Sequence, residues 1–173
     1  MEFWDILDVT GNKTGRTIWR GQAFQAGEYH LVVHVHIINK QGEFLIQKRS
    51  LTKAVLPGVW DITSGAVLSG EDSLAGAIRE TEEELGISLC PEKFLMITRL
   101  KRKNNFVDIW AAFSDVSLDD VVMQVGEVDE VKFVNADDMM NIIFSPEYPK
   151  YREYIYKQAM LEVLRNINLP HMQ

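Results

Sequence analysis

Four glutamates and one arginine of this 173-residue chain are spaced in a way that suits metal-assisted chemistry. Glu80, Glu83 and Glu84 stand at i, i+3 and i+4, which brings their carboxylates together on one side of a helix. Carboxylates held that close repel one another, and Mg²⁺ or Mn²⁺ relieves the repulsion because both ions prefer oxygen ligands. Arg79 lies off this stripe and can reach back to Glu71. The pattern favours a metal site for phosphate chemistry over a solvated acidic helix face, which most such runs are.

The segment that carries these residues has the beginning, the buried face and the end of an amphipathic helix. Asp72 or Ser73 can cap its N-terminus, and Gly86 supplies the usual stop. Thr81 is the polar member of the predicted buried stripe, where its hydroxyl can bond back to the preceding turn. The whole stripe, at i, i+3, i+4 and i+7 spacing, consists of Leu74, Ala77, Ile78, Thr81 and Leu85.

Residues 65–87 resemble the Nudix box, whose pattern is G-x5-E-x7-R-E-U-x-E-E-x-G-U with U aliphatic. The matching positions are Gly65, Glu71, Arg79, Glu80, Glu83, Glu84 and Gly86. Thr81 departs from the pattern, because the family prefers Leu, Ile or Val there. The resemblance implies an enzyme that hydrolyses a diphosphate linked to another group and uses Mg²⁺ or Mn²⁺. It also implies an α/β fold, the α/β/α Nudix sandwich with a mixed sheet.

The resemblance assigns roles to the acidic residues. The three helix glutamates would hold the metal, and Gly65, Glu71, Arg79 and Gly86 would shape the box. A catalytic carboxylate that takes the proton of the attacking water is expected among Glu83, Glu84 and Glu127. Glu127 stands where many Nudix hydrolases carry an extra carboxylate, and Asp129 or Glu130 could serve in its place. Which of these glutamates is the base stays open.

Lys48 and Arg49 are the candidate residues for binding the substrate. They end a predicted strand before the Pro57-Gly58 turn, where Nudix proteins often place basic residues that contact phosphate. Neighbouring strand residues point to opposite faces, so at most one of the two should face the site. Arg49 is favoured over Lys48, with a surface position as the alternative.

A second resemblance is to Nudix proteins related to isopentenyl-diphosphate isomerase. The segments that carry it are Tyr29-His30-Leu31, Leu45-Ile46-Gln47-Lys48-Arg49 and Pro57-Gly58-Val59-Trp60-Asp61. The isomerases use a cysteine and a histidine just before the box helix, where this chain has Ser64 and Ala66. The chain therefore resembles the isomerase in scaffold and a hydrolase in chemistry. The expected substrate is a nucleoside diphosphate or related conjugate; isomerase-like activity and hydrolysis of isoprenoid diphosphates are the alternatives.

Three histidines alternate along one predicted strand, so His30, His34 and His36 should lie on the same face of the sheet. His30 matches a metal ligand of the isomerases, but the partner ligands of that site are missing. Packing or hydrogen-bonding roles are therefore expected for all three.

Composition agrees with a compact acidic enzyme that acts on a small molecule. A chain of 173 residues with 46% hydrophobic content predicts one domain over residues 1–173, and the resemblance implies that it is a Nudix domain. The net charge of −7 argues against a nucleic acid polymer as partner, whereas metal ions can bridge an acidic protein to a diphosphate. The single cysteine, Cys90, suits the cytoplasm, and we expect neither a secretion signal nor a membrane span. The oligomeric state stays open, with a homodimer as one option.

Strands interleaved with a few helices predict the α/β sandwich. The expected strands are Phe3–Val9, Thr17–Phe24, Leu31–Ile38, Phe44–Lys48, Val59–Thr63, Phe94–Leu100, Val107–Phe113 and Val128–Val134. Besides the box helix, we expect a short helix over residues 136–144 and a last helix over about 151–167. Ile155, Leu161 and Leu164 are expected on the buried side of the last helix.

Overall fold

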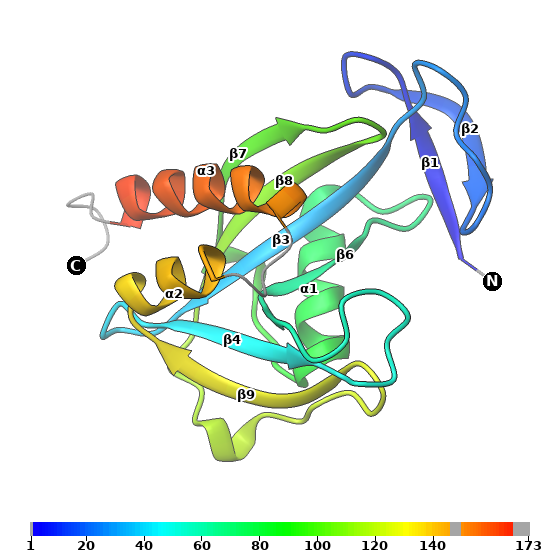
Figure 1. Cartoon of the computed structure of the whole chain (residues 1–173). Coiled ribbons are helices and arrows are strands. Elements are labelled where there is room, and N and C mark those ends of the chain that lie inside the picture. The colour runs from blue at the N-terminus through cyan, green and yellow to red at the C-terminus, as the bar shows by residue number, and fades with distance from the viewer. Residues whose placement is uncertain (1, 146–149, 168–173) are drawn as a thin grey trace.

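A computed structural model describes residues 2–145 and 150–167, apart from the side chains of residues 150–155 and 167. A hairpin of β1 (Phe3–Leu7) and β2 (Lys13–Trp19) stands beside a seven-stranded sheet (Figure 1). The strands of that sheet are β3 (His30–Ile38), β4 (Phe44–Arg49), β5 (Trp60–Asp61), β6 (Thr63–Ala66), β7 (Phe94–Lys101), β8 (Asn105–Phe113) and β9 (Val128–Val134). The helices are α1 (Ser73–Leu85), α2 (Ala136–Ile143) and α3 (Lys150–Ile167).

The central strand, β3, has two different neighbours along one of its edges. It pairs with β4 only at Ile37 and Ile38, and farther along it pairs with β6 from Val32 to Val35. β3 and β4 therefore diverge, and the chain enters between them as β5 and β6 before α1 begins. The other edge of β3 pairs in parallel with β8 over its whole length, which makes the sheet mixed.

Helices cover both faces of the sheet. Val33 and Val35 of β3 are fully buried in a cluster that includes Leu85 of α1. Ile38, which points to the other face, packs in a cluster with Met139 of α2 and other residues of α2 and α3. Figure 1 shows α2 and α3 in front of the sheet and α1 behind it. The predicted α/β/α sandwich with a mixed sheet is confirmed.

The ends of the box helix are as predicted. Asp72 is the N-cap, and its side chain accepts a hydrogen bond from the backbone N–H of Ala75 at 2.8 Å. Gly86 ends the helix in the left-handed conformation at φ 66°. Thr81 is buried, and its hydroxyl donates to the carbonyl of Ala77 at 2.8 Å. A threonine is therefore accommodated at an aliphatic position of the box because a carbonyl of the preceding turn accepts the hydrogen bond of its hydroxyl.

Two predicted strands differ most from the structure. β2 runs from Lys13 to Trp19 rather than from Thr17 to Phe24. It begins early because the Asp8 side chain accepts bonds from the N–H groups of Thr10 and Asn12 and tightens the turn. The strand predicted over Val59–Thr63 is divided into β5 and β6, since the first pairs with β4 and the second with β3.

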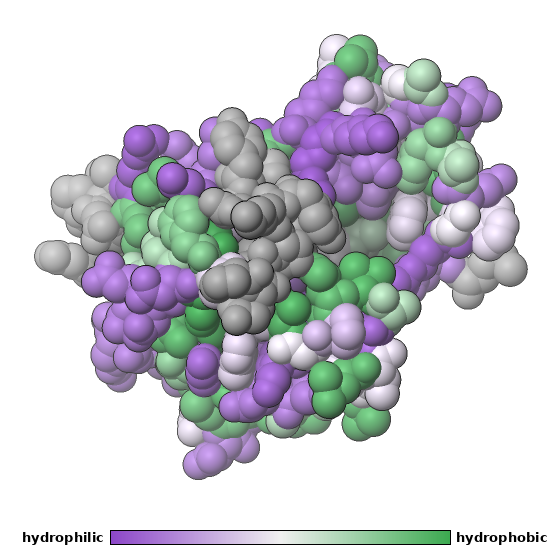
Figure 2. All heavy atoms as spheres, viewed as in Figure 1, coloured by the Kyte–Doolittle hydropathy of each residue, from purple (hydrophilic) through white to green (hydrophobic). Residues whose placement is uncertain are grey.

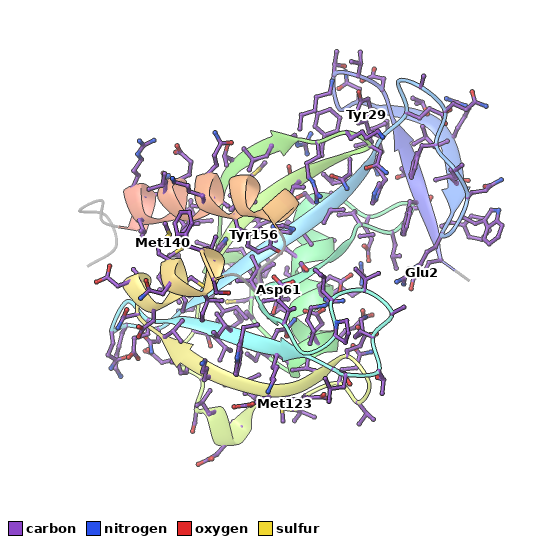
Figure 3. The ribbon with its side chains drawn as sticks, viewed as in Figure 1. Glu2, Tyr29, Asp61, Met123, Met140 and Tyr156 are labelled. Carbon is purple, nitrogen blue, oxygen red and sulfur yellow. The ribbon has the colours of Figure 1, made fainter. Side chains whose placement is uncertain are left out.

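The last helix is where it was predicted, but its buried face differs. Leu164 packs against the core as predicted, whereas Leu161 is 41% exposed, so its prediction as a buried residue is wrong. The side chain of Ile155 lies outside the described residues. Among the described side chains of α3, the buried ones are Tyr156, Ala159, Met160 and Val163. Tyr156 fixes this face because its hydroxyl donates to buried Asp61 of β5 at 2.8 Å (Figure 3).

None of the helices in the described residues has an apolar stretch that could span a membrane.

His36 is a neutral histidine in the core. It is fully buried, and among the described residues neither of its ring nitrogens has a hydrogen-bond partner. Burial lowers the pKa of His36 to about 4. In the unfolded chain a histidine titrates near ~6.5, so below that pH the unfolded state takes up the proton first. His36 should therefore destabilise the fold increasingly as the pH falls from its unfolded pKa towards 4.

Replacing His36 by leucine should remove this pH dependence. Between pH 7 and pH 4 the free energy of unfolding of His36→Leu should fall by ~3 kcal/mol less than that of the wild type, at 1.36 kcal/mol per pKa unit. Urea denaturation of both proteins at several pH values measures the difference. Parallel curves for the two proteins would contradict a neutral, buried imidazole at this position.

Candidate active site

A cleft of about 430 Å³ brings together segments that are far apart in the sequence. Helix α1 contributes its glutamate stripe, and β6 contributes backbone and small side chains. The loop after β4 and the turn before β9 form one rim, and the β1–β2 hairpin forms another. Apolar side chains gather over the loop between β4 and β5, where Leu51 and Val55 are exposed (Figure 2).

Arg79 fastens the loop before α1 to the helix. Its Nε and Nη2 donate to the two carboxylate oxygens of Glu71 at 2.8 and 3.1 Å. Nη2 also donates to the carbonyl of Ala66, and Glu71 accepts from the N–H of Leu68, both at 2.9 Å. Burial alone would raise the pKa of Glu71, but these hydrogen bonds lower it below its ordinary value. The contact expected between Arg79 and Glu71 is present and is bidentate.

The same guanidinium pairs with two glutamates of the stripe. Arg79 Nη1 lies 2.8 Å from Glu80 Oε1 and 2.9 Å from Glu83 Oε2. Burial raises the pKa of Glu80, and Arg79 offsets the rise only in part. The Glu80 carboxyl also lies directly against the backbone of Gly65, where an added Cβ would stand 2.0 Å from its Cδ. Gly65 thus leaves the room that the Glu80 carboxyl occupies.

Glu84 is the most deeply buried carboxylate of the stripe, with 6% of its surface exposed. Its Oε2 accepts from Gln47 Nε2 at 2.7 Å and from the N–H of Ser64 at 3.2 Å. Burial raises the pKa of Glu84 to about 8 against the opposing bond from Gln47, and Glu80 adds to the rise. No lysine or arginine among the described residues pairs with Glu84. A bound cation would stabilise its charged form.

Gln47 is a site residue that the sequence analysis missed. It lies in β4 with 2% of its surface exposed, and register places it opposite Asp61 of β5. The available signal was a polar residue that directly follows the apolar run Phe44-Leu45-Ile46 in a predicted strand. Because buried polar groups are nearly always paired, a buried glutamine in such a strand predicts a polar partner on the facing helix.

Of the two basic residues that end β4, Arg49 lines the cleft. Its Nε and Nη2 donate to the carbonyl of Val55 at 3.2 and 3.0 Å. Lys48 points to the opposite face, where its Nζ lies 3.5 Å from Glu130 and 5.9 Å from the ring centre of Trp60. Strand alternation therefore separates the two side chains, and a substrate-binding role for Arg49 stays a prediction.

The three carboxylates near the start of β9 also lie in different places and have different partners. Glu127 lines the cleft and forms an ion pair with Lys53. Asp129 accepts from the N–H of Leu51 at 2.9 Å, and Glu130 faces Lys48. Glu127 is thus the member of this group that lines the same cleft as the helix glutamates. The position of Lys53 in the cleft could not be predicted from the sequence, because a single lysine in a loop gives no indication of which way its side chain points.

Comparison with known proteins agrees with this geometry. The NUDIX domain family model matches residues 28–157. The chain belongs to the Nudix family. It is 39% identical over 156 residues to an uncharacterized Nudix hydrolase of Listeria monocytogenes, covering 87% of this chain and 90% of that protein. It is 35% identical over 167 residues to Nudix hydrolase 3 of Arabidopsis thaliana, covering 88% of this chain and 22% of that protein.

Solved structures show the same Nudix fold. A Deinococcus radiodurans protein matches with a TM-score of 0.75 at 20% identity, over 91% of this chain and 99% of that one. An Ap4A hydrolase of Caenorhabditis elegans matches with a TM-score of 0.56 at 22% identity, over 79% of this chain and 96% of that one. The family match and the relatives identify the protein as a Nudix hydrolase, and the solved structures agree with it in fold.

The Nudix carboxylates suit a hard divalent cation by their chemistry. Among the side chains that the structure describes, no three of His, Cys, Asp or Glu form a ready metal cluster. Arg79 holds Glu80 and Glu83, while Gln47 and the Ser64 N–H hold Glu84. The donors are all oxygens, and burial raises the pKa of both Glu80 and Glu84. A divalent cation stabilises the charged form of such carboxylates, so the donor set fits Mg²⁺ or Mn²⁺.

Replacing Gly65 by alanine should inactivate the Nudix site without unfolding the protein. Residue 65 has no left-handed φ, so the new methyl group acts only by its contact with the Glu80 carboxyl, 2.0 Å away. That carboxyl is the end of a flexible side chain, which can move at little cost to the fold. We expect kcat/KM to fall by at least ~10-fold, because a group misplaced by about 1 Å loses much of its catalytic effect.

The double variant Gly65→Ala, Glu80→Asp is the control for this mechanism. Aspartate is one methylene shorter and should leave room for the alanine methyl group, so part of the lost activity should return relative to Gly65→Ala. Thermal denaturation shows whether each variant is folded. Full activity in Gly65→Ala would show that the position of the Glu80 carboxyl is not important.

Proposed function

We propose that the protein cleaves the diphosphate bond of a nucleoside diphosphate or related conjugate, with Mg²⁺ or Mn²⁺ held by Glu80, Glu83 and Glu84. One observation carries the proposal: the helix glutamates line the same cleft as the basic side chains of Arg49 and Lys53. A diphosphate needs both kinds of group, since cations must lie between it and the carboxylates. Charge of both signs in one cleft meets this need.

The side chains of the cleft have separable tasks. The bound metal would neutralise the diphosphate and lower the pKa of the attacking water. Glu84 would be a fixed ligand because Gln47 and the Ser64 N–H hold its carboxylate in place. Arg49 and Lys53 would orient the phosphate groups from the opposite rim of the cleft. The proton of the water would pass to Glu83, Glu84 or Glu127, all of which line this cleft.

Hydrolysis suits these residues better than isomerisation. An isomerase must protonate an unactivated alkene, which needs a strong and positioned acid. Ser64 and Ala66 line the cleft at the positions that carry the cysteine and histidine of the isomerases. Neither a hydroxyl nor a methyl group is such an acid. The resemblance to the isomerase branch therefore concerns the scaffold, and isoprenoid diphosphates rank second as substrates for hydrolysis.

A substrate screen with identified products tests the proposal. Nucleoside diphosphates, sugar nucleotides, dinucleotides and isoprenoid diphosphates are each incubated with the protein and Mg²⁺, and the products are separated by mass. We expect cleavage between the two phosphorus atoms in at least one class. An arm with isopentenyl diphosphate in deuterated water addresses the alternative. Deuterium in dimethylallyl diphosphate at enzymatic rates would replace the hydrolase proposal by isomerisation.

Other expectations about the whole protein stay proposals. We infer that residues 1–173 act as one domain, which agrees with the bridge between Leu7 of the hairpin and Tyr29. We also infer a cytoplasmic location, since the free thiol of Cys90 is exposed and suits a reducing compartment. A small-molecule diphosphate is the proposed partner, and a homodimer is the oligomer to test by light scattering.

A further inference from the structure

A second cavity of about 640 Å³, here called the hairpin cavity, adjoins the active-site cleft. It is formed mainly by residues 21–28, which connect β2 to β3, together with Lys103 and Asn104. Of the residues that line the two cavities, Trp4 and His30 are common to both. These two side chains form the boundary between the carboxylates and the hairpin cavity.

The boundary is made of stacked aromatic rings. The rings of Trp4 and His30 lie 4.5 Å apart and 14° from parallel, and Phe24 stacks on His30 at 5.2 Å and 16°. His30 has 8% of its surface exposed, and none of the described residues forms a hydrogen bond with its Nδ1. Burial, with Arg102 adding to the effect, lowers the pKa of His30 to about 4. The boundary is therefore an uncharged aromatic surface at neutral pH.

Unused hydrogen-bonding capacity accompanies these rings. The indole Nε1 of Trp4 is buried and, like the Nδ1 of His30, has no hydrogen-bond partner in the described part of the chain. Buried polar groups without partners are rare and call for an explanation. The hairpin cavity itself is lined by the amides Gln22, Gln25 and Asn104. Flat rings with amide donors and acceptors beside them match a flat ring that carries hydrogen-bonding groups. An alkyl chain offers no such groups.

We propose that the hairpin cavity binds a nucleobase attached to the diphosphate, and that Trp4 is a specificity-determining residue that stacks on it. The proposal rests on the proposed function, because a diphosphate bound at the carboxylates would direct its other end across the Trp4 boundary. Trp4 and most of the cavity lining precede the NUDIX match, which begins at residue 28. The hairpin would thus add a surface that binds the base to the domain that the family shares.

Binding of nucleoside monophosphates tests this without relying on turnover. AMP, GMP, CMP and UMP carry a base but no diphosphate bond, and ribose 5-phosphate is the matched ligand without a base. Isothermal titration of the full chain should show at least one nucleotide binding ~10-fold more tightly than ribose 5-phosphate, because a base can stack on an aromatic side chain and a ribose cannot. Equal affinities for all five ligands would overturn the proposal.

Variants assign the effect to Trp4. Trp4→Leu should weaken binding of that nucleotide by at least ~10-fold, whereas Trp4→Phe retains a flat ring and should weaken it less. Trp19→Leu is the matched control, because Trp19 lies on the same hairpin, is 45% exposed and lines neither cavity. Unchanged nucleotide affinity in folded Trp4→Leu would overturn the proposal. A Trp4→Leu variant that loses binding of isopentenyl diphosphate but keeps binding of the nucleotide would also overturn it.

A measurement on the wild type covers the case in which Trp4→Leu does not fold. In proton–nitrogen NMR spectra, the nucleotide should shift the indole N–H signal of Trp4 and leave that of Trp19 in place. The opposite pattern would overturn the proposal. Nucleotide binding that depends on Trp4, in a protein that cleaves no diphosphate, would reject the proposed function and keep the base site. The two failures are therefore distinguishable.

Discussion

Glu84→Gln should lower the rate of diphosphate hydrolysis by at least ~10²-fold while the protein stays folded. Glu84 is the buried end of the carboxylate stripe, and its Oε2 accepts from Gln47 Nε2 at 2.7 Å. Glutamine keeps the shape of the side chain but removes the negative charge that would hold the metal. Steady-state kinetics on the substrate found by the screen measure the loss, and circular dichroism checks the fold.

Two neighbours on the same helix serve as comparisons. Glu83→Gln should lose activity to a similar degree, because Glu83 lines the same cleft. Glu82→Gln should keep nearly full activity, since Glu82 is exposed and its Oε1 accepts from the Ser88 hydroxyl at 2.9 Å, away from the cleft. Equal rates for Glu82→Gln and Glu84→Gln would show that the stripe is not the metal site.

Arg79→Ala should reduce both stability and activity. Without Arg79, Glu71 and Glu80 lose their ion pairs, although their carboxylates are only 22% and 13% exposed. Removing one partner of a buried pair costs ~3–5 kcal/mol, and because this one is partly exposed we expect about 2–3 kcal/mol in urea denaturation. The loop before α1 should also become more mobile, since the hydrogen bonds from Arg79 to Ala66 and Glu71 are lost. Because this loop helps to position the site, activity should fall by at least ~10²-fold.

Arg79→Lys separates charge from geometry. Lysine retains the positive charge but lacks the planar fork that bonds Glu71 through two nitrogens. We expect it to recover part of the stability and little of the activity. Stability within ~0.5 kcal/mol of the wild type in Arg79→Ala would place that arginine among ordinary surface residues, against the contacts described above.

Local features of the site could be predicted from the sequence. The caps at Asp72 and Gly86, the bond of Thr81 to Ala77 and the reach of Arg79 to Glu71 depend on residues at most eight apart. Within a helix or across one turn, backbone geometry fixes which side chains meet. The same reasoning separates Lys48 from Arg49, because alternation along a strand is as regular as the turns of a helix.

Long-range contacts could not be predicted in this way. Gln47 meets Glu84 across 37 residues, and Lys53 meets Glu127 across 74. These pairs depend on how β3 and β4 diverge and on which way two loops turn. The split of one expected strand into β5 and β6 has the same origin, since each part pairs with a different strand. The proposed base-binding role of Trp4 could not be predicted either, because it depends on how the hairpin packs beside β3.

Removal and return of the metal test the central claim most directly, namely that the carboxylates of the cleft act through a divalent cation. The protein is stripped with excess chelator, its residual metal is measured by elemental analysis, and hydrolysis is followed before and after addition of millimolar Mg²⁺ or Mn²⁺. We expect no turnover in the stripped protein and full recovery on addition of either ion, with Glu84→Gln failing to recover. Turnover that continues in excess chelator, with the metal shown to be gone, would contradict the claim.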